Sequence, residues 1–264
     1  MPMDYALICL VSLLVAGLTF FSGFGLGTLL MPVFAIFFPL DVAIAATAVI
    51  HLANNLFKVG LVGRHANMRI TRLFALPAAI AALGGAWLLS YLTALPTLYT
   101  YSLAGRHFAI TPVKLIIAGV ITVFALLELH PALARLRVST KLVPLGGILS
   151  GFFGGLSGHQ GALRSAFLMR THLDKQALIA TAVLSAVLVD ISRLLVYGST
   201  LMDQKIDVLK LQDGIGLVIA GSLAAFTGSV VGSRLLRTVT LYGLKTFMAL
   251  MLILLAIALG SGLI

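Results

Sequence analysis

The feature that most constrains this chain is a polar, glycine-containing break inside an otherwise apolar run. Residues 142–170 are largely apolar except at their centre, which reads Leu156-Ser157-Gly158-His159-Gln160-Gly161-Ala162-Leu163-Arg164. An earlier break, Phe21-Ser22-Gly23-Phe24-Gly25-Leu26-Gly27, interrupts the uncharged run from Tyr5 to Leu40. Backbone that leaves helical geometry at membrane depth needs partners in protein or in a water-filled cavity. Two such breaks at matching places in two halves predict that the functional site lies at the breaks.

The composition places the chain in a lipid bilayer. Only 10% of its 264 residues are charged and 60% are hydrophobic, whereas soluble domains are about 25% charged. Several apolar runs exceed the roughly 18 residues that mark a spanning helix. The net charge of +10 is assigned to short loops that orient the protein, so nucleic acid is not expected as a partner. Cys9 is the single cysteine, which excludes a thiolate metal site; no metal and no cofactor are expected.

The apolar runs predict an all-α polytopic membrane protein built from two repeats. In the first repeat, residues 1–130, the predicted elements are a broken helical hairpin and three helices, over 5–38, 41–61, 73–92 and 112–129. In the second repeat, residues 131–264, the same kinds of element are predicted over 142–170, 174–197, 214–233 and 240–259. Gly84 in the first repeat is expected, with Gly85, to let a neighbouring helix pack closely.

Basic loops predict the orientation. They carry Arg64, Arg69 and Arg72, then Arg135, Arg137 and Lys141, and finally Arg234 and Arg237. Basic loops face the cytoplasm, so the connections around Arg106 and Asp207 and both termini are expected outside. The hairpin over 142–170 must then enter and leave on the cytoplasmic side as a re-entrant hairpin. The same reasoning makes the hairpin over 5–38 enter from outside.

A short internal repeat supports the division into halves. Ala46-Thr47-Ala48-Val49-Ile50 recurs as Ala180-Thr181-Ala182-Val183-Leu184 after the second break, and Val113-Lys114 is matched by Leu244-Lys245. The halves have the same order of elements and opposite predicted orientations. They therefore correspond to the inverted-topology repeats of many secondary transporters.

These motifs resemble those of the sulfite exporter TauE/SafE family, also called the toluene-sulfonate uptake permease family. The resemblance covers essentially the whole chain. It rests on the glycine-rich block at 21–27 with Pro32 after it, on the two Ala-Thr-Ala-Val repeats, and on Gly151-Phe152-Phe153-Gly154-Gly155-Leu156-Ser157-Gly158. It implies a multi-pass carrier in a bacterial or archaeal inner membrane that moves small sulfur-containing or organic anions, such as sulfite, sulfonates or sulfoacetate. At His159-Gln160 the sequence departs from commoner members, in which a further small residue is more usual.

The two breaks supply most of the candidate substrate-binding residues. Freed glycine N–H groups and a helix N-terminus form a cradle for an oxyanion, and serine hydroxyls add donors. The candidates are Ser22, Gly23, Gly25, Asn54, Asn55, Ser157, Gly158, His159, Gln160 and Arg164. The breaks are expected to approach each other near the bilayer midplane. The alternative is that the glycines serve close helix packing and the asparagines interhelical hydrogen bonds.

Charges inside the predicted helices are candidates for coupling to an ion gradient. Asp190 lies deep in a helix, and Arg193 is spaced to form a charge pair with it. His159 can titrate near neutral pH, so His159 and Asp190 are the candidates for proton exchange. A structural Asp190–Arg193 pair is the alternative role, and sodium is the alternative coupling ion. Lys58 is expected to snorkel to the cytoplasmic interface.

The sequence thus predicts a secondary transporter that works by alternating access around a midplane site. Its expected partners are a small anion and the lipid bilayer, with homo-oligomerisation left open. A passive anion channel is an alternative because broken helices also build selectivity filters. An enzyme is not expected: a phosphatase acting on lipid pyrophosphates needs hairpin carboxylates, and neither break carries one. Ser157 with His51 leaves an intramembrane serine protease open.

Overall fold

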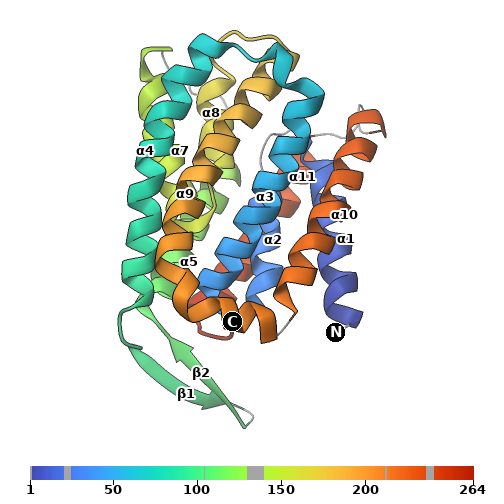
Figure 1. Ribbon diagram of the computed structural model, residues 1–264. Helices are drawn as coiled ribbons and strands as arrows, with labels where there is room; N and C mark the ends of the chain where they lie inside the picture. The colour runs from blue at the N-terminus through green and yellow to red at the C-terminus, as the bar shows by residue number, and fades with distance from the viewer. Residues whose placement is uncertain (1, 21–24, 104, 130–139, 212, 236–240) are drawn as a thin grey trace.

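A computed structural model describes residues 2–20, 25–103, 105–129, 140–211, 213–235 and 241–264 (Figure 1). This part of the chain is a helical bundle with one two-stranded β-hairpin. Its elements are α1 (Pro2–Leu18), α2 (Leu26–Ala35), α3 (Leu40–Val62), α4 (Met68–Thr93), β1 (Tyr99–Leu103), β2 (Arg106–Ile110), α5 (Pro112–Leu129), α7 (Val143–Ser157), α8 (Gly161–Leu168), α9 (Lys175–Leu211), α10 (Gly214–Leu235) and α11 (Leu241–Gly260). Single 3₁₀ turns lie at Gly63–His65 and Thr140–Leu142.

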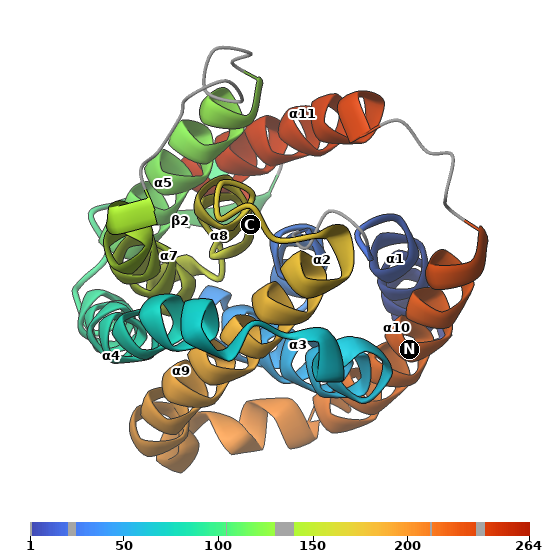
Figure 2. The same cartoon turned by 90° about the horizontal axis from the view of Figure 1, so that it is seen from above.

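The long helices fit a multi-pass membrane protein. Four of the described helical stretches are long and apolar enough to cross a membrane: Leu40–His65, Met68–Thr93, Lys175–Thr200 and Gly214–Arg234. Seen from above, the short helices α2 and α8 lie inside a ring of the other helices (Figure 2). The centre of the protein is therefore built from the helices that follow the two breaks.

Helices α4 and α7 pack backbone against backbone through glycine. A Cβ at Gly147 would lie 2.2 Å from the carbonyl oxygen of Phe74, and a Cβ at Gly155 would lie 2.1 Å from that of Ala82. Only glycine permits this approach. Because the contacts advance in the same direction along both helices, α4 and α7 run parallel and begin at the same end of the bundle.

The expectation for Gly84 is wrong, and its neighbour makes the contact instead. A Cβ at Gly84 would meet nothing within 4 Å, whereas a Cβ at Gly85 would lie 2.0 Å from the carbonyl oxygen of Phe152 on α7. Successive helical residues point about 100° apart, since a turn takes 3.6 residues. Of the two glycines, only Gly85 is on the face of α4 that α7 covers.

Helices α7 and α8 form a hairpin that enters and leaves at one end of the bundle. A Cβ at Gly146, near the start of α7, would collide with the ring of Phe167, near the end of α8. Closer to the turn, the Ser150 hydroxyl donates to the carbonyl of Gln160 at 2.8 Å. The chain reverses at Gly158, whose φ of +81° is left-handed and suits glycine. The second break therefore lies at the turn of a helical hairpin.

Helix α1 packs along α10 in the same manner as α7 along α4. A Cβ at Gly228 would lie 2.1 Å from the carbonyl oxygen of Leu13, and a Cβ at Gly232 would lie 2.4 Å from that of Gly17. These contacts also advance in parallel. The first helix of each half thus packs on the second long helix of the other half.

Two segments differ from the sequence prediction. Helix α9 continues to Leu211 instead of ending at residue 197, because residues 199–211 contain no glycine or proline to stop it. The connection after α4 contains the β-hairpin, in which Tyr101 pairs with Phe108 and their rings stack 5.4 Å apart. Both termini lie at the same end of the bundle as this hairpin, and the connection from α3 to α4 lies at the other end (Figure 1).

Candidate functional site

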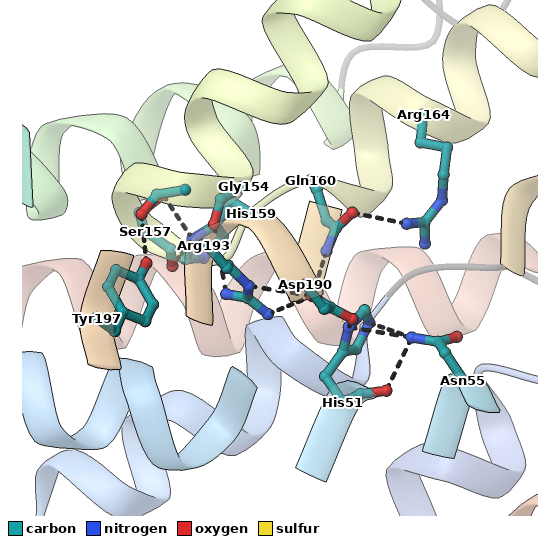
Figure 3. A network of polar contacts seen from close by, with 11 residues as sticks. His51, Asn55, Gly154, Ser157, His159, Gln160, Arg164, Asp190, Arg193 and Tyr197 are labelled. Carbon is teal, nitrogen blue, oxygen red and sulfur yellow. Dashed lines mark hydrogen bonds and ion pairs between the residues drawn. The ribbon is translucent and has the colours of Figure 1, made fainter. Parts of the chain in front are cut away.

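A buried polar network centred on Asp190 joins three parts of the protein (Figure 3). The Asp190 side chain, on α9, is completely buried. Its Oδ2 lies 2.6 Å from Nδ1 of His51, halfway along α3. Its Oδ1 accepts from Nε2 of Gln160, in the turn between α7 and α8, at 2.8 Å. The Asp190 carboxylate on α9 therefore connects the turn between α7 and α8 to α3.

Arg193 neutralises this carboxylate from the next turn of α9. Its Nη2 lies 2.7 Å from Oδ1 of Asp190 and its Nε 3.0 Å from the same atom. The remaining Nη1 donates to the carbonyl of Gly154 on α7 at 3.3 Å. One turn further on, the Tyr197 hydroxyl donates to the carbonyl of Gly155. The side chains of Arg193 and Tyr197 therefore attach α9 to the C-terminal end of α7.

The two breaks meet beside this network. A Cβ on Gly27, in the first turn of α2, would lie 3.5 Å from the carbonyl oxygen of Gly158 and 3.5 Å from Cδ2 of His51. Helix α2 begins at Leu26 and α8 begins at Gly161, so both short helices start at this junction. The N-terminus of a helix carries a partial positive charge and unpaired N–H groups. The junction therefore combines two helix N-termini in the middle of the bundle.

At the junction, only one of the two ring nitrogens of His159 forms a hydrogen bond with a described residue. Its side chain is buried, and Nδ1 donates to the carbonyl of Ser157 at 2.9 Å. Its Nε2 has no hydrogen-bond partner within the part of the chain that the structure describes. The ring stacks on Phe124 of α5, with 6.3 Å between centroids and 7° between planes. Because the carbonyl fixes hydrogen on Nδ1, Nε2 of the neutral ring is an acceptor and becomes a donor only when the ring is protonated.

Three further buried polar groups extend the network towards the end of the bundle where α3 ends. Arg164 Nη1 donates to Oε1 of Gln160 at 2.9 Å. Asn55 Nδ2 donates to the carbonyl of His51 at 2.9 Å. Lys58, the next polar residue along α3, is 6% exposed and its Nζ lies 5.2 Å from the ring centroid of Phe20. Polar side chains thus follow one face of α3 outwards from Asp190.

A cavity of about 480 Å³ lies at this end of the bundle. Its walls come from the end of α3, the start of α9, the end of α10 and Phe20. Phe20 thus contacts both the cavity and the Lys58 ammonium group. Lys175 and Gln176 line the cavity and are exposed, so the cavity opens to the surface. We call it the vestibule. Among the described residues, no group of three or more His, Cys, Asp and Glu side chains could hold a metal ion.

Comparison with known families agrees with the architecture. The sequence model of the family described as "Sulfite exporter TauE/SafE" matches residues 8–259, nearly the whole chain. The chain belongs to the sulfite exporter TauE/SafE family. The resemblance drawn from the sequence motifs is thereby confirmed, and with it a multi-pass membrane protein of a transporter family. Comparison with curated proteins and with solved structures gave no match.

In this TauE/SafE protein the structure brings some of the sequence candidates together. Gly158, His159, Gln160 and Arg164 lie in or directly after the second break, and Asn55 faces them from α3 beside His51. Figure 3 shows contacts that run from Arg164 through Gln160, Asp190 and His51 to Asn55, whereas His159 contacts Ser157. Gly25, a candidate in the first break, has a φ of +121°. Ser22 and Gly23 lie outside the described residues.

Other candidates have local partners. The Ser157 hydroxyl donates to the carbonyl of Phe153 one turn back in α7, at 3.0 Å. Asn54 accepts from the hydroxyl of Ser229 on α10 at 2.7 Å, which is the interhelical hydrogen bond considered as its alternative role. Lys58 does not snorkel. It is buried, because the α3 surface at this position faces Phe20 and not the lipid.

Sequence reasoning missed His51 as a partner of Asp190 and gave Tyr197 no role. A signal for His51 exists in the sequence: Thr47, His51, Asn55 and Lys58 recur at intervals of three or four residues and so share one face of α3. A polar stripe in an apolar helix points to the interior of the bundle. Nothing comparable marks Tyr197.

Proposed function

We propose that this TauE/SafE family member is a secondary transporter of small sulfur-containing or organic anions such as sulfite and sulfonates. The observation that carries the proposal is the junction of the two breaks. There, the N-termini of α2 and α8 meet beside Gly158 and a buried histidine nitrogen is unpaired within the described residues. Helix N-termini and glycine backbone bind oxyanions without requiring a full charge. Broken helices at the centre of a bundle are where many carriers bind substrate.

The packing supports alternating access between two inverted repeats. Helix α7 is bound to α4 and helix α1 to α10 by glycine contacts too close for independent sliding. We infer two bodies: α4 with the α7–α8 hairpin, and α10 with α1 and α2. Their rocking against each other exposes the junction to one side and then the other. The basic loops orient the vestibule towards the cytoplasm and both termini away from it, in an inner membrane.

The geometry at His159 supports proton coupling. Nε2 can donate to an anion only when the ring is protonated, because Nδ1 already donates to Ser157. Binding of anion and proton would therefore be linked. The charged group nearest in the network is Arg193, which is held by Asp190, so it does not replace the missing donor. Asp190 serves mainly to hold the network together and is the second candidate for proton exchange.

The test uses purified protein in proteoliposomes. Uptake of radiolabelled sulfite should saturate, show counterflow with trapped sulfite, and accelerate when the outside is more acidic. His159→Gln, which keeps a hydrogen-bonding side chain but cannot be protonated, should retain counterflow and lose the acceleration by acid. The control is His65→Gln, because His65 lies in the loop after α3 and contacts only Val62 among the hydrogen bonds found for it.

Two results would contradict the proposal. Flux that rises linearly with sulfite concentration and lacks counterflow would identify a channel. Absence of flux for sulfite, thiosulfate, sulfonates and carboxylates alike, with no shift of Tm by any of them, would exclude the substrate class, since a bound ligand stabilises the folded protein.

A further inference from the structure

One face of α4 is apolar and exposed along most of the length of the helix. It consists of large side chains at intervals of three or four residues, which are Leu73, Leu76, Ile80, Leu83 and Trp87. We call these five residues the lipid stripe. Because α4 is long and apolar enough to cross a membrane, an exposed face of this kind contacts the acyl chains of the bilayer.

Two arginines lie at one end of the lipid stripe and two stacked aromatic rings at the other. Arg69 and Arg72 are exposed, and they lie four residues before the first two members of the stripe, so they continue the same face. At the far end, the rings of Trp87 and Tyr91 stack with 6.0 Å between centroids, and such residues gather at membrane interfaces. Arg72 and Tyr91 are nineteen residues apart, or about 28 Å along a helix, which is close to the roughly 30 Å thickness of the hydrocarbon core. The arginines are therefore level with the phospholipid headgroups of one leaflet.

Helix α7 widens the apolar surface beside these arginines. The parallel contacts between the two helices pair Phe74 of α4 with Gly147 of α7. Leu145 of α7 is therefore level with Arg72 of α4. Leu145 and Ile148 are both exposed. Figure 2 shows the two helices side by side at the edge of the bundle, as the glycine contacts require. An acyl chain that lies along either helix would thus have its headgroup at the arginines.

The end of the bundle that carries the arginines is strongly basic. The exposed basic side chains described at this end are Arg64, Arg69, Arg72, Lys141, Lys175 and Arg234. The acidic side chain described there is Asp174, which accepts hydrogen bonds from backbone N–H groups at the start of α9. Neither Arg69 nor Arg72 forms an ion pair with a described residue. The partner that matches both their charge and the apolar face next to them is an anionic phospholipid.

We propose that Arg69 and Arg72 bind the phosphate of an anionic phospholipid such as phosphatidylglycerol, whose acyl chains lie on the lipid stripe and on α7. Guanidinium groups bind phosphate oxygens in bidentate geometry. Residues three apart are neighbours on a helix, so both side chains reach one headgroup. A zwitterionic phospholipid has the same phosphate, but its headgroup also carries a cation that the arginines repel. The site is separate from the junction and independent of the transported anion.

The experiment measures lipid binding to detergent-purified protein by native mass spectrometry and by the shift of Tm. The probes are phosphatidylglycerol, phosphatidylcholine with the same acyl chains, and glycerol phosphate, which has the phosphate without the chains. The test variant is Arg69→Gln/Arg72→Gln, and Arg69→Lys/Arg72→Lys keeps the two charges. The matched control is Arg64→Gln/Arg234→Gln, which removes two exposed arginines from the same end of the bundle but outside the lipid stripe.

Wild-type protein should bind phosphatidylglycerol in preference to phosphatidylcholine, with a rise in Tm that glycerol phosphate does not give. A basic residue near an anionic lipid surface strengthens binding about fivefold, so the test variant should bind phosphatidylglycerol roughly twentyfold more weakly and lose the preference. The lysine variant should keep the preference. The matched control should keep it too, because salt screens charges that lie farther from the headgroup.

The Tm of lipid-free protein shows whether each variant is folded, and the replaced arginines are exposed and lie outside the face of α4 that packs on α7. Equal binding of the two phospholipids by wild-type protein would overturn the site. Equal losses in the test variant and the matched control would do the same, because the attraction would then belong to the whole basic end. A rise in Tm with glycerol phosphate as large as with phosphatidylglycerol would show that the acyl chains contribute nothing, and it too would refute a lipid site.

Discussion

Substituting Gly85 by alanine should destabilise the protein far more than the same substitution at Gly84. A Cβ at Gly85 would lie 2.0 Å from the carbonyl oxygen of Phe152, and ordinary contact begins at 3.4 Å. Helices α4 and α7 would therefore have to separate locally by about 1.4 Å, the difference between these distances. Overpacking of this kind costs about 1–3 kcal/mol. The upper value is expected because the obstacle is backbone, which cannot rotate away as a side chain does.

The assay is the Tm of detergent-purified protein. For a chain of this size, 1 kcal/mol corresponds to about 2–4 °C, so Gly85→Ala should lower Tm by about 6–12 °C. Gly84→Ala meets nothing within 4 Å and replaces a flexible residue inside a helix, which favours folding by about 0.5–1 kcal/mol. Its Tm should stay the same or rise by a few degrees. Equal losses at the two positions, or no loss at Gly85, would refute the parallel packing of α4 on α7.

Three other predictions concern orientation, the hairpin turn and the buried carboxylate. In a cysteine-free Cys9→Ser background, a thiol reagent should label Arg64→Cys only from the cytoplasm and Arg106→Cys only from outside, since both positions are exposed. Labelling of both positions from one face would refute the orientation. Gly158→Leu should abolish sulfite uptake in proteoliposomes while the protein still inserts, because a side chain is strained at φ +81° and would crowd Arg193; undiminished uptake would show that the turn does not bind substrate. Asp190→Asn should lower the free energy of unfolding by about 3–5 kcal/mol, the cost of a buried cation left unpaired; an unchanged Tm would mean that Asp190 is not the centre of the network.

Local features of this fold were predictable from the sequence because they depend on neighbouring residues. The length of the apolar runs and their lack of charged residues identified the membrane helices. The polar break identified the hairpin turn at Gly158. The spacing of Asp190 and Arg193 is sufficient to suggest a contact between them, because residues three apart are neighbours on a helix. The charged segment after residue 197 shows the limit of such reasoning, since a change in polarity marks where a helix leaves the bilayer and not where it ends.

The other contacts of the candidate site depend on how distant helices are rotated, and no local pattern records that. His51 and Asp190 are separated by 139 residues. Gly84 and Gly85 are chemically identical in the sequence, and only the position of α7 distinguishes them. Lys58 lies near the end of its helix, which suggests an interfacial side chain, but the rotation of α3 turns it towards Phe20. In each case the outcome was decided by tertiary packing.

The pairing of α1 with α10 has a consequence for biosynthesis. The ribosome makes the backbone surface around Leu13 and Gly17 first, but the glycines that cover it, Gly228 and Gly232, are made more than 200 residues later. Until α10 leaves the translocon, only lipid or an assembly factor can cover this surface of α1. Long-range pairing of this kind is slow and leaves intermediates open to aggregation. A nascent chain that stops before Gly214 should therefore be inserted but remain unassembled, and quality-control proteases should degrade it.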